Sequence, residues 1–77
     1  MKYMSLELST RSIECTVMSK RGDLIHCSSF ILSLEKVRDV IDKVKLPIAL
    51  VFEECELAGW LYCNLVYDVD QIVVAEP

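Results

Sequence analysis

Two glutamates stand where acidic side chains could do chemistry, because each lies at the end of a predicted β-strand. Glu7 lies near the end of the alternating segment 3–8, and Glu53 follows the apolar run 48–52. Parallel sheets bind ligands beyond the carboxyl ends of their strands, so the two side chains come together if these strands are neighbours. A carboxylate pair there can hold a hard divalent cation such as Mg²⁺ and orient a water molecule against a phosphodiester.

Each glutamate also has a structural interpretation. Glu53 and Glu54 precede a predicted helix, and acids at the start of a helix are commonly stabilised by its dipole. Glu7 alternates with apolar residues, so it can equally be the solvent-facing residue of a half-buried strand. The residues alone leave both alternatives open.

The other candidates for chemistry are better explained as structural residues. His26 is the single histidine and has no Cys-x-x-Cys pair near it, so we expect it at the surface or partly buried. Trp60 and Tyr62 have no interleaved basic residues, which favours packing over base stacking. Lys20 and Arg21 lie in a predicted turn, and no glycine-rich junction to a helix follows them to bind a phosphate.

Four cysteines are present, but their spacing does not suit a zinc site, because no Cys-x-x-Cys pair occurs. Cys55 and Cys63, if on one helix, are roughly 12 Å apart, which is too far for a disulfide. We therefore expect all four to be reduced and mostly buried thiols, namely Cys15, Cys27, Cys55 and Cys63.

Composition limits the chain to one small domain spanning residues 1–77. The net charge of −4 disfavours independent binding of DNA, because a nucleic-acid binder usually carries a basic patch. No apolar run approaches the length of a membrane span and the first residues do not form a signal peptide, so we expect a cytoplasmic protein without a membrane partner. Hydrophobic residues make up 53% of the chain, which is more than one thin core can hide.

Hydrophobic periodicity predicts a three-stranded meander followed by two strand and helix repeats. Period-2 alternation predicts strands over 3–8, 12–19 and 24–31, with turns at 9–11 and 20–23. Ser33 is a good N-cap for a helix whose apolar stripe runs from Leu34 to Val44 and which ends before Pro47. The run 48–52 predicts a central parallel strand, a stripe of Leu57, Trp60, Leu61 and Leu65 predicts a second helix, and 72–75 predicts the last strand.

These elements predict an α/β fold with the order β-β-β-α-β-α-β. Two right-handed crossovers that step in the same direction place both helices on one face of the sheet. We expect the strand order 3-2-1-4-5, with the second strand antiparallel to the rest. This is the order of the front half of a ribonuclease H-like fold.

The segment from Leu50 to Glu56, with Trp60 seven residues after Glu53 and the ending 73–77, resembles insertion-sequence transposases of the Piv/MooV type. That family has a RuvC-like nuclease domain with four acids, in the order Asp, Glu, Asp, Asp. Its pattern has an opening strand with glycine, a hydrophobe and aspartate, then a meander, a helix, and a strand that ends in a hydrophobe and glutamate. The resemblance covers essentially all 77 residues in order.

The resemblance implies that Glu7 and Glu53 correspond to the first two acids of the family and that Mg²⁺ is the possible cofactor. Two departures weaken this expectation. Ser5-Leu6-Glu7 replaces glycine, hydrophobe and aspartate, and the extra methylene of glutamate moves the carboxylate by more than an ångström. The last two aspartates of the family lie further downstream than Pro77. We therefore expect a truncated domain that does not cut DNA alone and meets DNA only within a longer chain or with a partner.

Three functions are compared. The first is the leading segment of a transposase nuclease domain, and the second is a non-catalytic module that keeps the fold and forms a homodimer. Half of an actin-like ATPase is disfavoured, because the turn at 9–12 lacks a glycine-rich phosphate loop. The homodimer is expected to form through the sheet face without helices or through the apolar edge strand 72–75. One of two alternate sets of the central strand must lie on that face, either Ile48, Leu50 and Phe52 or Ala49 and Val51.

Overall fold

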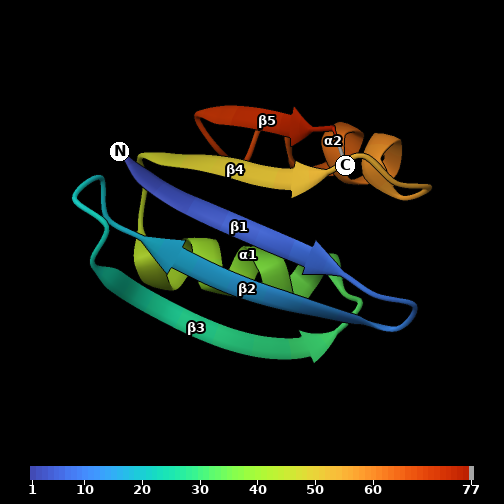
Figure 1. Ribbon diagram of the computed structural model, residues 1–77, viewed down its shortest axis with the longest axis horizontal. Coiled ribbons are helices and arrows are strands. Elements are labelled where there is room, and N and C mark those ends of the chain that lie inside the picture. Colours follow the sequence, from blue (N-terminus) through green and yellow to red (C-terminus); the bar gives the residue numbers. More distant parts are fainter. Residues whose placement is uncertain (77) are drawn as a thin grey trace.

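The computed structural model describes residues 1–76 and contains five strands and two helices. The sheet has the order β3-β2-β1-β4-β5, in which β2 alone is antiparallel to the others. Both helices lie behind the same face of the sheet (Figure 1). The predicted topology is therefore confirmed, with these elements: β1 (Lys2–Leu8), β2 (Ser12–Met18), β3 (Leu24–Ile31), α1 (Leu34–Val44), β4 (Ile48–Glu53), α2 (Ala58–Leu65) and β5 (Gln71–Ala75).

The turns and caps form where the local sequence favours them. In the β2–β3 hairpin the Ser19 N–H donates to the Asp23 carbonyl at 2.8 Å, and Gly22 takes a φ of 95°, which glycine adopts without a steric penalty. The Ser33 hydroxyl accepts from the Lys36 N–H at 3.3 Å and so caps α1 as predicted. The helix ends at Val44, three residues before Pro47.

The core lies between the sheet and the two helices. Met4, Leu6 and Phe52 point from β1 and β4 toward the helices and are at most 3% exposed. The sequence left open which alternate set of β4 is covered, and the structure places Ile48, Leu50 and Phe52 in the core. None of the helices in the part of the chain described is long and apolar enough to cross a membrane. The helices contribute a shared inward set: Val37, Val40, Ile41, Ala58, Leu61 and Leu65.

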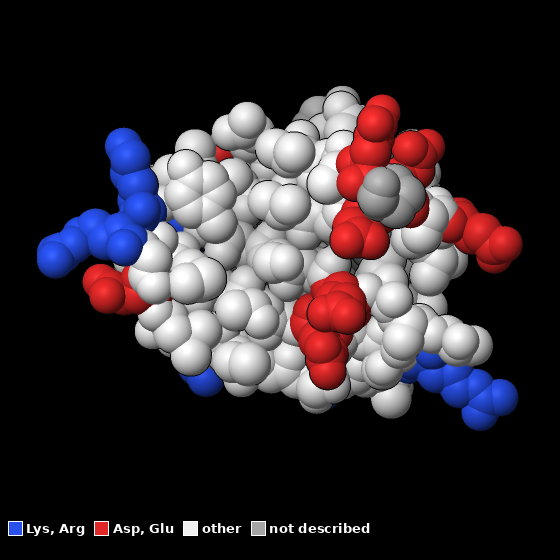
Figure 2. Space-filling view, in the orientation of Figure 1, with Lys and Arg blue, Asp and Glu red and all other residues white. Residues whose placement is uncertain are grey.

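The other face of the sheet carries no helix. We call it the open face, and Figure 2 shows that most of it is uncharged, with acidic side chains gathered toward the end where β1 and β4 finish. Strand alternation and register assign its residues: Tyr3, Ser5, Glu7, Ser12, Glu14, Thr16, Met18, Leu24, Cys27, Ser29, Ile31, Ala49, Val51, Glu53, Gln71, Val73 and Ala75.

Two expectations about burial were wrong. All four cysteines are free, but only Cys15 is buried. Cys27 is exposed because His26 and Ser28 take the helix-covered positions of β3 and leave Cys27 on the open face. Trp60 and Tyr62 are 41% and 46% exposed rather than packed, because α2 begins at Ala58 and its inward stripe runs through Ala58, Leu61 and Leu65.

Asp70, the residue before β5, forms two hydrogen bonds with Ile48, the first residue of β4. Its carboxylate accepts from the Ile48 N–H at 2.7 Å, and its own N–H donates to the Ile48 carbonyl at 3.0 Å. We expect Asp70→Ala to lower the free energy of unfolding by about 1–3 kcal/mol, because the Ile48 N–H loses a charged acceptor. Urea unfolding measures the change. Asp39→Ala, at an exposed position of α1, should leave the value unchanged or raise it slightly, and an equal loss in both variants would contradict this role for Asp70.

Candidate functional site

Glu7 and Glu53 lie side by side at the carboxyl end of the two parallel strands β1 and β4. Leu6 pairs with Phe52, and the two glutamates are the next residues on their strands. Because Leu6 and Phe52 point into the core, strand alternation turns both glutamates to the open face, where they are exposed. The parallel sheet thus places the two predicted acids at the edge where ligands of such sheets bind.

A third glutamate extends this pair into a row. Glu14 of β2 pairs directly with Glu7, so three neighbouring strands carry a carboxylate at the same level of the open face. Glu14 was not predicted as a site residue, because the predicted turn at 9–11 would pair Glu7 with Ile13, and the observed register, in which Leu8 pairs with Ile13, differs by one residue. We call Glu14, Glu7 and Glu53 the glutamate row.

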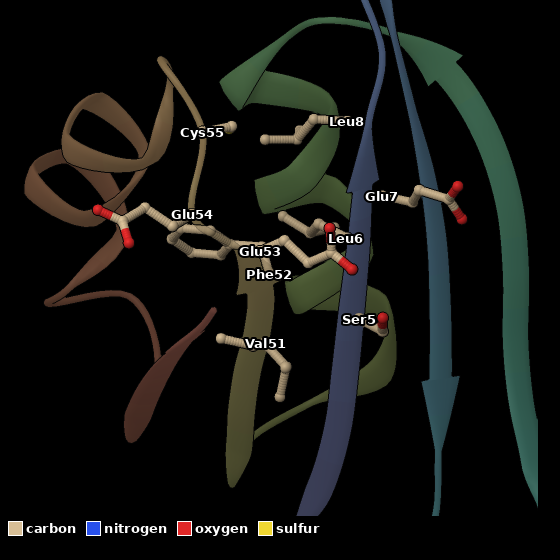
Figure 3. A pocket seen from close by; sticks show the side chains of 10 residues that line it. Ser5, Leu6, Glu7, Leu8, Val51, Phe52, Glu53, Glu54 and Cys55 are labelled. Atoms are coloured by element: carbon tan, nitrogen blue, oxygen red, sulfur yellow. The ribbon is translucent and has the colours of Figure 1, made fainter. Parts of the chain in front are cut away.

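The carboxylates of the row do not converge on a point. Figure 3 shows the Glu53 side chain reaching toward β1, that of Glu7 reaching toward β2, and that of Glu54 pointing away on the other side of β4. Among residues 1–76 no group of three or more His, Cys, Asp or Glu side chains is arranged to hold a metal ion. The oxygen donors have the right chemistry for Mg²⁺, but by themselves they fit only a site in which water supplies most ligands. No reaction step through a metal follows from this arrangement.

A hollow of about 490 Å³ adjoins Glu7 and Glu53. It opens where β1, β4 and β5 end. There the Glu54 N–H donates to the Ala75 carbonyl at 2.8 Å and so joins the end of β5 to the residue that follows β4. Its polar groups other than glutamate are the Ser5 hydroxyl and the exposed Cys55 thiol, neither of which was predicted as a site residue. The full lining is Ser5, Leu6, Glu7, Leu8, Val51, Phe52, Glu53, Glu54, Cys55 and Ala75.

The structure also decides the alternative interpretation of the acids after β4. The first turn of α2 contains no acid, and its N-cap is Leu57, which makes no side-chain capping hydrogen bond. Glu53 is the last residue of β4, and Glu54 and Glu56 lie in the loop that follows. Neither Glu53 nor Glu54 therefore lies in the first turn of α2 or caps it, and any stabilisation by the helix dipole would act across the loop 54–57.

The remaining candidate residues lie away from the row. His26 is partly buried on the helix-covered side of β3, and its Nε2 lies 2.8 Å from the Ser28 hydroxyl. Lys20 and Arg21 lie in the β2–β3 hairpin at the opposite end of the sheet. Pro77, the end of the motif that carried the family resemblance, lies outside the residues described.

Comparisons with models of protein families, with curated proteins and with solved structures were made for the whole chain. None of the three finds a match. The assignment of a function therefore rests on the glutamate row, the open face and the sequence motifs.

Proposed function

We propose that this chain is the leading segment of a ribonuclease H-like nuclease domain of the insertion-sequence transposase type, with a role in DNA transposition in the cytoplasm. One observation carries the proposal. The two acids that the family resemblance singles out, Glu7 and Glu53, are neighbours at the carboxyl ends of β1 and β4. In a 3-2-1-4-5 sheet these are the two central parallel strands, where a phosphodiester-cleaving site of this class is assembled.

In this proposal the chain supplies part of a site and does not act alone. Glu7 and Glu53 would hold one face of a Mg²⁺ ion, and the ion would supply an activated water for phosphodiester cleavage. Further acids must come from a longer chain or a partner, because the glutamates present do not converge. DNA contact must come from elsewhere too, since the net charge of −4 opposes the approach of phosphates.

Manganese binding tests the proposal. Mn²⁺ occupies the same oxygen-ligand sites as Mg²⁺ and broadens the NMR signals of nearby nuclei. We expect sub-stoichiometric Mn²⁺ to broaden the backbone amide signals of residues 6–8 and 52–54 selectively. Glu53→Gln and Glu7→Gln should each weaken the apparent affinity by about tenfold, because a pair of carboxylates becomes a single one.

The matched control is Glu35→Gln, which removes an exposed glutamate from the first turn of α1. This variant should leave the broadening pattern unchanged. Equal broadening around every exposed acid, or a pattern that survives both Glu7→Gln and Glu53→Gln, would count against the proposed site. Metal-dependent nicking of supercoiled plasmid by the chain alone, if abolished by Glu53→Gln, would show that the chain is a complete nuclease rather than a segment of one.

A second candidate function is a non-catalytic interaction module. The open face favours it, because Tyr3, Met18 and Val73 are 43%, 39% and 42% exposed there, with no helix to cover them. Monomeric proteins rarely expose a large contiguous apolar patch, and such a patch commonly marks an interaction site. Absence of selective Mn²⁺ broadening together with self-association would favour this function over the first.

A further inference from the structure

We propose that the open face binds the open face of a second copy of this chain, in a two-fold dimer whose strands run antiparallel across the interface. The inference extends the second candidate function by naming the partner and its orientation. It does not require Glu7 and Glu53 to bind a metal, so the two proposals fail separately.

The size of the open face matches what a dimer needs. The molecule measures 30 × 23 × 21 Å, and Figure 2 shows the open face along the shortest of these axes. The whole molecule therefore projects roughly 700 Å² in this direction, which is an upper limit for the open face and is of the same order as the ~800 Å² per partner of a standard interface. A smaller ligand would leave most of this surface in water.

The composition of the face suits a packed sheet pair. Between the charged ends it carries Tyr3, Ser5, Thr16, Met18, Val51 and Val73, and none of these residues is Asp, Glu, Lys or Arg. Two sheets that pack face to face bury their facing side chains about as deeply as a domain core, so an uncharged centre is required. No lysine or arginine belongs to the open face as defined.

Charge then selects the orientation. One end of the face carries the glutamate row, and the β2–β3 hairpin at the other end carries Lys20 and Arg21, both exposed. Figure 2 shows the acidic patches toward the end where β1 and β4 finish and basic side chains beyond the hairpin end. Arg11 in the β1–β2 turn lies near the three glutamates, and Asp23 lies in the hairpin with Lys20 and Arg21. The glutamate end therefore stays net negative and the hairpin end net positive.

Two ways of stacking identical faces about a two-fold axis differ in what these ends meet. An axis along the strands places the glutamate row of one copy on that of the other, with six carboxylates in one layer. An axis across the strands places each glutamate row over the partner's Lys20–Arg21 hairpin. Like charges brought together across an interface are costly and opposite charges are favourable, so the axis lies across the strands.

The position of the interface is tested by a pair of adjacent residues. Val73 and Val74 follow each other on β5 and are 42% and 40% exposed, but Val73 belongs to the open face and Val74 pairs with Phe52 on the helix side. By sedimentation equilibrium at micromolar concentration we expect a dimer. Val73→Lys should weaken the dimer at least about tenfold, because it buries an unpaired charge, whereas Val74→Lys should change it less than about twofold.

A second pair of variants tests the centre of the face in the same way. Thr16→Lys should dissociate the dimer, and Tyr62→Lys, at an exposed position of α2 on the helix-covered side, should not. Far-UV circular dichroism and thermal unfolding establish that each variant is folded. A wild-type monomer at all concentrations, or equal weakening by Val73→Lys and Val74→Lys, would overturn the proposal, and so would a monomer that binds an amphipathic helical peptide on this face.

Charge reversal tests the orientation. The double variant Lys20→Glu, Arg21→Glu should weaken self-association at least about tenfold, since acids would then face acids. The double variant Glu7→Lys, Glu14→Lys should weaken it similarly, and mixing the two variants should restore dimers in the form of heterodimers. Self-association that is unchanged or tightened by Lys20→Glu, Arg21→Glu would overturn the antiparallel arrangement, as would tightening of the wild-type dimer when salt is raised from low ionic strength.

Discussion

Phe52→Ala is expected to lower the free energy of unfolding by about 3–5 kcal/mol. Phe52 is 2% exposed and is the largest of the fully buried side chains. It lies on β4 between its partners Leu6 of β1 and Val74 of β5, so its removal leaves a cavity beneath the centre of the sheet. A domain of this size has about 5–15 kcal/mol of stability in total, so the variant should be largely unfolded by modest denaturant. Urea titration followed by circular dichroism measures the effect.

Phe30→Ala provides the matched control. Phe30 is the other phenylalanine of the chain, and it packs against the edge of the core from β3 while remaining partly exposed. Because less apolar area returns to water and the site opens to solvent, its loss should cost less than half as much. An equal cost for the two substitutions would mean that the core is not centred on β4.

Cys15 is expected to react with a thiol reagent such as Ellman's reagent at least about 100-fold more slowly than the other three cysteines at pH 8. Burial raises the pKa of the Cys15 thiol from 9.0 to about 11, and the nearby Cys27 adds to this by repelling the thiolate charge. A rise of this size alone lowers the thiolate fraction about 100-fold, and the thiolate is the reactive form. Cys27, Cys55 and Cys63 are exposed and should react in the first phase.

The same shift makes stability depend on pH in a defined direction. The folded state holds the Cys15 proton more tightly than the unfolded state, so the thiol contributes stability that is complete below about pH 9 and is lost as the pH rises toward about 11. Cys15→Ala removes this dependence, and the difference in slope between wild type and variant isolates it from lysine and tyrosine titration. Four thiols that react in one fast phase, or identical slopes above pH 9, would contradict the burial of Cys15.

The candidate site was predicted in part. Glu7 and Glu53 were placed by strand ends alone, because the apolar stretches before them are long enough to locate the ends of β1 and β4. Glu14 was missed because its position beside Glu7 follows from cross-strand register and not from any motif. The direction in which each carboxylate points could not be predicted, since exposed glutamate side chains take their rotamers from their neighbours in space.

The sequence by itself determined the order and type of the elements and, through the right-handed crossovers, the placement of both helices on one face. It determined these because hydrophobic periodicity and turn residues are local signals that extend over whole segments. Only the tertiary structure decided which of two alternate sets on β4 enters the core, that Cys15 alone among the cysteines is buried, and that Trp60 lies outside the α2 stripe. These outcomes depend on which face of the sheet a given strand residue points to, or on the residue at which a short helix begins. A shift of one residue exchanges the buried and exposed side chains, so packing against the rest of the chain decides them.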